Sequence, residues 1–259
     1  MTEMRWTQNR SLNVSHEVKD RVDHDPVIYH HHITAPLASG LSRSTSLSEH
    51  AYRDIRRMIV LLELAPGAVI REDALQSSLQ LGRTPIREAL QRLVRDQFVT
   101  VIPRRGMYVS SIDVGDLAVL YETRAILEPY AMRLACARGD DGAWNEMATL
   151  LKSATDSSTP VQLLEIDRRC RELVWAAADN RFLTDQLDML YAHSDRLWHL
   201  YLGDVAGLHD MIDEHRAILT ALRAEDADSA AELIEAHMHR FDEQIRNAVR
   251  RRLESPLAG

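Results

Sequence analysis

Residues 83–93 read RTPIREALQRL, and this stretch decides how the first part of the chain folds. Thr84 is a typical helix N-cap residue, and Pro85 suits the first helical position, where no backbone N–H is needed. The apolar side chains then recur at the spacing of an amphipathic helix: Ile86, Ala89, Leu90 and Leu93. Arg83 and Arg87 fall outside that apolar stripe, so we expect them to face a partner.

Two helices are predicted before this stretch and two strands after it. A Pro-Gly turn at Pro66-Gly67 separates the first helix from the second, and a change to alternating apolar residues marks the strands. The predicted elements are helices over 46–64, over 72–79 and from 84 onward, then strands over 98–101 and 107–109. Three helices and a two-stranded ribbon predict a winged helix-turn-helix domain over residues 41–111.

The rest of the chain shows helical periodicity and no strand pattern. The predicted helices cover roughly 114–138, 142–155, 160–178, 181–202, 206–223 and 227–252. We therefore predict a mostly α protein, in which an N-terminal winged helix-turn-helix precedes an all-α helical bundle over residues 112–253. Residues 1–40 lack sustained periodicity and are expected to form a flexible tail, as are residues 254–259.

Charge divides the chain in the same way. The net charge is −8, yet residues 41–111 hold 11 Arg against 7 Asp and Glu, a net of +4. Residues 112–259 hold 16 Lys and Arg against 27 Asp and Glu, a net of −11. A hydrophobic content of 45% excludes a wholly disordered protein. No apolar run is long enough for a membrane helix or signal peptide, so we expect a cytoplasmic protein without a membrane partner.

The basic segment has the composition of a surface that binds nucleic acid. In a helix-turn-helix, the N-terminal end of the second helix enters the major groove, and Arg83, Thr84 and Arg87 lie at that end. Arg71 is expected to meet phosphate. The predicted hairpin tip, Arg104-Arg105-Gly106, can lie along the minor groove, where glycine permits close approach of the backbone. The alternative is a small solvated domain whose arginines are ordinary surface charge.

The order of these motifs resembles the DNA-binding domain of GntR-family bacterial transcription regulators. The resemblance rests on residues 83–93, on Pro66-Gly67 with Ile70-Arg71-Glu72, and on the turn at 103–106. The run Arg124-Ala125-Ile126-Leu127-Glu128-Pro129 resembles the start of the effector domain in the FadR subfamily. The resemblance implies a homodimer that binds a short palindromic operator in double-stranded DNA. It departs at Leu79-Gln80-Leu81-Gly82, where the family usually has leucine-glycine-valine-serine.

Ionisable side chains fall on the apolar stripes of four predicted helices. His215 and His237 each sit in the middle of such a stripe, Asp167 and Arg171 lie one turn apart at the edge of another, and Arg124 lies between two leucines. Burying these groups is unfavourable unless they pair, bind a metal or bind a ligand. Pairing within the protein, Asp167 with Arg171 and each histidine with its own partner, is the structural alternative.

The resemblance adds a metal hypothesis. Many FadR-type effector domains hold a divalent ion with an aspartate, a histidine four residues later and two further histidines. Asp167, His215 and His237 match three of these positions, and Arg171 stands at the fourth. A guanidinium cannot ligate a metal. Two interpretations stay open: three ligands hold zinc, nickel or manganese, or Arg171 replaces the ion's charge and captures an effector carboxylate. Other candidate effector contacts are Arg124, His193 and Arg196.

The favoured function is a ligand-responsive transcription regulator, and more specifically a repressor of a metabolic operon whose operator affinity responds to a small organic acid. Two alternatives are a regulator that has lost effector sensing and a helical metalloenzyme built on the Asp167, His215 and His237 cluster. The enzyme would need a catalytic base. Glu172 and Glu214 are near in sequence, but their angular positions are expected to point them away from the apolar stripes of their helices.

Overall fold

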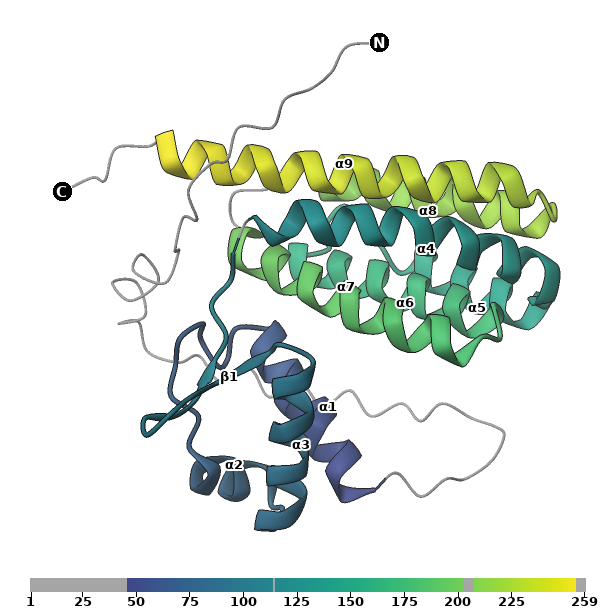
Figure 1. The fold of residues 1–259 in the computed structure, drawn as a ribbon. Helices are drawn as coiled ribbons and strands as arrows, with labels where there is room; N and C mark the ends of the chain where they lie inside the picture. Colours follow the sequence, from purple (N-terminus) through teal and green to yellow (C-terminus); the bar gives the residue numbers. More distant parts are fainter. Residues whose placement is uncertain (1–45, 114, 203–206, 255–259) are drawn as a thin grey trace. The chain divides into compact units, whose positions relative to one another are not determined.

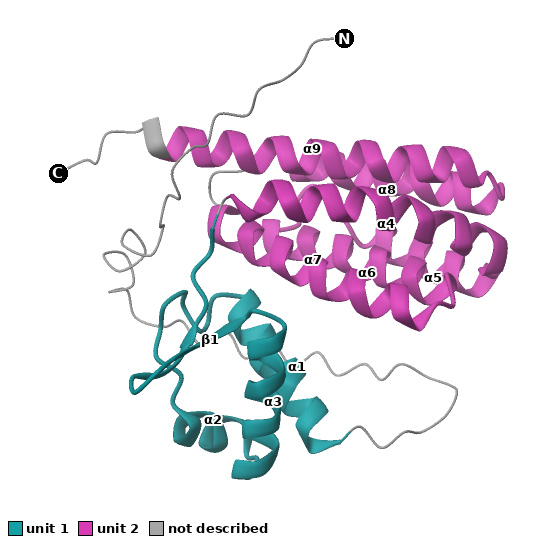
Figure 2. Cartoon of the chain, in the orientation of Figure 1, with its two compact units in different colours: residues 1–113 teal, residues 114–259 magenta. Residues whose placement is uncertain are grey.

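The computed structural model describes residues 46–113, 115–202 and 207–254. Residues 253 and 254 are described by their backbone alone. The chain divides into two compact units, residues 1–113 and residues 114–259 (Figure 2). The tail predicted over residues 1–40 lies outside the described residues, as does the tail at the C-terminus beyond Glu254. Among the described helices, none has the length and apolar character needed to cross a membrane.

The described part of the first unit, residues 46–113, contains three helices and a two-stranded antiparallel sheet (Figure 1), which confirms the winged helix-turn-helix. Val99 pairs with Val109 and Ile102 with Gly106 in the sheet. The core is formed by side chains with no exposed surface, among them Ile55, Ile59, Ile86, Leu90, Leu93 and Phe98. The elements are α1 (Leu47–Val60), α2 (Glu72–Leu79), α3 (Arg83–Arg95), β1 (Val99–Ile102) and β2 (Gly106–Val109).

Helix α3 begins at Arg83, two residues before Pro85, where the sequence predicts its first helical residue. Gly82 is its N-cap, without a side-chain hydrogen bond, so the assignment of Thr84 as N-cap is wrong. Pro85 still lies within the first turn, where its missing N–H has no helical partner to lose. Because Arg83 is now helical, Arg83 and Arg87 are four residues apart on one face of the helix.

The turn between α2 and α3 contains a left-handed residue that is not glycine. Gln80 has φ 55° and ψ 36°, and its backbone N–H donates to the carbonyl of Gln76. This is the position at which the resembled family has glycine, the residue that adopts this conformation at no steric cost. The side chain of Gln80 donates to the carbonyl of Ser77 (2.7 Å), which partly offsets that cost.

The second unit is an all-α bundle, as predicted. Asp140, Thr159 and Asn180 cap the N-termini of three of its helices through side-chain hydrogen bonds. Helix α9 packs along α4 and α8, and α6 packs against α4, α5 and α8 (Figure 1). The helices are α4 (Asp116–Arg138), α5 (Asp141–Lys152), α6 (Pro160–Ala177), α7 (Arg181–Tyr201), α8 (Leu208–Arg223) and α9 (Ala227–Glu254).

Replacing Gln80 by glycine is expected to stabilise the turn between α2 and α3 by about 0.5–1 kcal/mol, because the left-handed conformation no longer strains a side chain. Gln76→Gly is the matched control within α2, where glycine should destabilise the helix by about 1 kcal/mol. Amide hydrogen exchange of α2 and α3 measures both changes. Equal loss of protection in the two variants would contradict this account of the turn.

Candidate nucleic-acid interface and buried polar centre

The face of α3 that carries Arg83 and Arg87 is open to solvent. Their side chains are 66% and 49% exposed, whereas the apolar residues of α3 form the core on the opposite side of the helix. Both Nε atoms approach the same carboxylate oxygen of Glu72, at 3.7 Å from Arg83 and 2.8 Å from Arg87. The two guanidinium groups therefore lie side by side at the N-terminal end of α3.

The other predicted DNA contacts in the first unit are also exposed: Arg71, Thr84, Arg104, Arg105 and Gly106. Arg71 precedes α2 as its N-cap residue. At the hairpin tip, Arg104 and Gly106 both have positive φ, 65° and 106°. This tight reversal is stabilised by the N–H of Arg105, which donates to the carbonyl of Ile102 (3.0 Å). The hairpin thus presents two neighbouring arginines at its tip.

In the second unit, Asp167, His215 and His237 converge from α6, α8 and α9 and are at most 1% exposed. Oδ1 of Asp167 lies 2.6 Å from Nε2 of His215 and 3.2 Å from Nε2 of His237. One potential ligand atom from each residue lies within 4.8 Å of the others, so the three are a group that could hold a metal ion. Tyr191 on α7 donates to Oδ2 of Asp167 (2.8 Å).

Arg171 points into this centre and is held by two carboxylates. Its Nε donates to Oδ2 of Asp167 (3.1 Å), and its Nη1 pairs with Glu128 of α4. Arg124, one turn before Glu128, donates to the other oxygen of that carboxylate. Arg171 and Glu128 are each 1% exposed. The sequence interpretation missed Glu128, although its position four residues after Arg124 was a usable signal.

Burial and charge act in opposite directions on these groups. Burial alone would raise the pKa of Asp167, but Arg171 and the hydrogen bonds from both histidines hold that pKa well below its ordinary value. Burial likewise opposes ionisation of Glu128, yet Arg124 and Arg171 lower its pKa. Burial lowers the pKa of His215. The centre therefore holds two ionised carboxylates against two arginines.

Glu214 contacts the centre, so the expectation that it points away is wrong. Its carboxylate lies 2.6 Å from Nδ1 of His237 and 2.5 Å from Arg240. The carboxylate turns Nε2 of His237 toward Asp167, an orientation also found in metal-binding histidines. His215 differs, because its Nδ1 is buried and has no hydrogen-bond partner among the described residues. Glu172, by contrast, pairs with Arg168 and Arg169 on α6.

These surroundings do not fit a divalent ion, although three donors are present. Coordination through Nε2 of His215 would place the proton on Nδ1, for which the described residues provide no acceptor. A dication would also add two positive charges to a centre in which Arg124 and Arg171 already balance Glu128 and Asp167. Arg171 occupies the position at which a fourth ligand was expected and contacts Asp167 itself.

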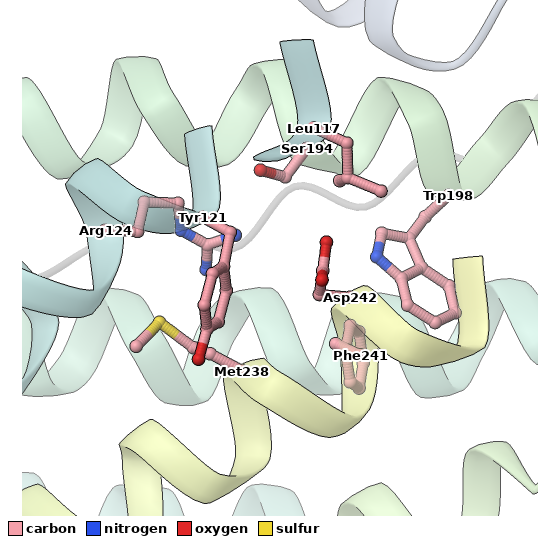
Figure 3. Close-up of a pocket in the computed structure, with 8 residues that line it drawn as sticks. All are labelled: Leu117, Tyr121, Arg124, Ser194, Trp198, Met238, Phe241 and Asp242. Carbon is pink, nitrogen blue, oxygen red and sulfur yellow. The ribbon is translucent and has the colours of Figure 1, made fainter. Parts of the chain in front are cut away.

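Two of the predicted effector contacts, Arg124 and Arg171, are brought together by the carboxylate of Glu128. Arg124 lines a small cavity between α4, α7 and α9, together with Tyr121, Ser194, Trp198 and Asp242 (Figure 3). The cavity volume is about 20 Å³, room for one water molecule. His193 and Arg196 are not among the residues that line this cavity. Arg196 is 2% exposed, and burial lowers its pKa to about 10.

Two family models match the chain, one in each unit. Residues 47–109 match the gntR family of bacterial regulatory proteins, and residues 119–240 match the FCD domain. Among solved structures, McbR/YncC of Escherichia coli is similar with a TM-score of 0.72 and 22% identity. That similarity covers 79% of this chain and 99% of the other, and it supports the same fold.

Curated relatives agree with these matches. The repressor GlaR of Escherichia coli is 30% identical over 208 residues, covering 75% of this chain and 93% of the relative. The Nta operon transcriptional regulator of Aminobacter aminovorans is 28% identical over 195 residues, covering 74% and 91%. The repressor RspR of Escherichia coli is 24% identical over 209 residues, covering 80% and 92%. The chain therefore belongs to the GntR family, as a helix-turn-helix transcription regulator with an FCD effector-binding domain.

Proposed function

We propose that the protein represses a metabolic operon in the cytoplasm and that a small organic acid changes its affinity for the operator. The observation that carries the DNA-binding part is the exposed pair Arg83 and Arg87 at the N-terminal end of α3. Repression is supported by two relatives that are named as repressors. The metalloenzyme alternative is not favoured, because the relatives are named as regulators and the buried centre is closed by arginine.

Each exposed arginine has a separate role in this proposal. Helix α3 enters the major groove, where Arg83 and Arg87 read guanine edges with paired donors and Thr84 contacts the adjacent backbone. Arg71 binds phosphate and adds affinity without sequence preference. The hairpin tip, Arg104 to Gly106, follows the minor groove. The net charge of +4 over residues 41–111 favours this unit, rather than the acidic bundle, as the part that meets DNA.

A palindromic operator requires two copies, and α4 offers a surface for a homodimer. Val119, Ile126 and Tyr130 are 62%, 71% and 53% exposed. They are spaced seven and four residues apart, on one face of the helix. The opposite face of α4 packs against α6, α7 and α9. We propose that a second copy of the chain covers this apolar stripe.

The organic acid is proposed to bind beside Arg124 rather than Arg171. Arg124 is 11% exposed and lines the cavity between α4, α7 and α9, whereas Arg171 is sealed between two carboxylates. An effector carboxylate competes with Glu128 for Arg124 and must open the cavity to do so. Binding there shifts α4, which also carries the proposed dimer surface. The distance between the two α3 helices of the dimer then no longer matches the spacing of the operator half-sites. In this proposal no zinc, nickel or manganese ion takes part.

Arg83→Ala and Arg87→Ala are each expected to weaken operator binding and to relax the base preference at one position by about 1–3 kcal/mol. Arg71→Ala should weaken binding to all sequences alike and make the salt dependence shallower by about 0.9 in log–log slope. Selection from a random duplex library, followed by titration at several salt concentrations, measures both effects. Arg95→Ala, at the far end of α3, is the matched control.

Those assignments fail if Arg83→Ala and Arg87→Ala leave both affinity and base preference as in the wild type. Loss of preference in Arg95→Ala of the same size would equally contradict the placement of the reading surface.

Ile126→Glu is expected to convert the dimer to a monomer, because it places a charge in the centre of the apolar stripe on α4. Val161→Glu changes a side chain of comparable exposure on α6 and should leave the dimer intact. Sedimentation velocity measures the oligomeric state, and operator affinity should fall when dimerisation is lost. A dimer that survives Ile126→Glu with unchanged affinity would exclude this surface.

Arg171→Ala is expected to reduce the free energy of unfolding by about 3–5 kcal/mol, because Asp167 and Glu128 lose their buried partner. Arg168→Ala, on the same helix, removes a partly exposed arginine and should cost less than about 1 kcal/mol. Urea denaturation followed by fluorescence of Trp144, Trp175 and Trp198 reports on this unit. Wild-type stability in Arg171→Ala would show that the guanidinium does not close the centre.

A further inference from the structure

Glu72 places a negative charge inside the surface that is proposed to bind DNA. It is the first residue of α2, and its carboxylate reaches across to α3, fifteen residues along the chain from Arg87. A single oxygen, Oε2, contacts Nε of both Arg83 and Arg87. An acidic group among phosphate-binding residues repels DNA and lowers affinity for every sequence equally. Its presence therefore needs a compensating role.

The geometry points to such a role. Because Glu72 engages each guanidinium through Nε, the terminal amino groups of both arginines can face outward. Those two groups form the edge that donates two parallel hydrogen bonds to O6 and N7 of guanine. A free arginine side chain on the surface samples many rotamers. Most of these bring the guanidinium to a phosphate, because the phosphates carry the negative charge of DNA and the base edges do not. A shared carboxylate restricts both arginines to neighbouring positions.

We propose that Glu72 is a positioning residue for base recognition, which directs Arg83 and Arg87 toward guanine edges and disfavours their contact with phosphate. Glu72 raises the ratio of operator affinity to non-specific affinity while lowering both affinities. This inference rests on the proposed function, because it needs α3 to read bases. It assigns sequence discrimination to an acidic residue that need not touch a base itself.

Three variants of the full chain separate charge from position. Glu72→Gln keeps the length of the side chain and removes its charge. Glu72→Asp keeps the charge but is one methylene shorter, so it cannot reach both arginines. Asp73→Asn is the matched control, since Asp73 is the next residue of α2, is exposed and forms none of the described ion pairs with α3. Hydrogen exchange of α2 and α3 verifies that each variant is folded.

The probes are the duplex enriched by the wild-type protein from a random library and a scrambled duplex of the same composition. Glu72→Gln should bind the scrambled duplex more tightly, by up to about tenfold at 0.1 M salt, while its operator-to-scrambled ratio falls by about tenfold. Glu72→Asp should lose a similar part of the ratio without binding the scrambled duplex more tightly. Asp73→Asn should keep the wild-type ratio.

A Glu72→Gln ratio within twofold of the wild-type value would overturn this proposal and leave the proposed function intact. A wild-type ratio in Glu72→Asp would overturn the positioning role and attribute the effect to charge alone. An equal fall of the ratio in Asp73→Asn would overturn it as well. A wild-type protein that enriches no sequence would overturn the proposed function together with this inference.

Discussion

The two buried ion pairs of Arg171, with Asp167 and with Glu128, are the interaction on which the helical unit depends. Through Asp167, helix α6 is joined to Tyr191 on α7, to His215 on α8 and to His237 on α9. Through Arg171 and Glu128 it is joined to α4. Five helices thus meet at one set of charges with almost no exposed surface. Each charge is unfavourable in an apolar interior alone, and all of them together form a closed network.

The two units use charge in opposite ways. In the helical unit, arginines and carboxylates neutralise each other inside the core and fix the relative positions of helices. In the DNA-binding unit, the core is apolar and the arginines lie on the surface, where the contacts with Glu72 leave them largely exposed. Surface ion pairs of this kind contribute little to stability. In the proposal above, they instead position the arginine side chains for binding to DNA.

The fold could be predicted because its signals are local. The apolar stripe of α3, the turn at Pro66-Gly67 and the alternation around residues 103–106 each depend on a few neighbouring residues. The predicted start of α3 was wrong because Thr84 and Pro85 are strong N-terminal signals, yet Gly82 can also begin a helix and the first turn accepts proline. Helix periodicity also identified Asp167, Arg171, His215 and His237 as inward-facing.

The contacts between those residues could not be predicted in the same way. Glu128 and Glu214 belong to the centre because of how α4 and α8 rotate and pack, and periodicity along one helix does not define that rotation. The link from Glu72 to Arg83 and Arg87 likewise depends on the angle between α2 and α3. Nor does a sequence tell whether an arginine at a ligand position binds an effector or closes the core.

Anomalous X-ray diffraction at the zinc absorption edge, from crystals of the full chain soaked in zinc, tests the closed centre most directly. The account predicts density for the Arg171 guanidinium between Asp167 and Glu128, and no anomalous peak among Asp167, His215 and His237. A peak bonded to those three residues, with Arg171 displaced from Asp167, would contradict it.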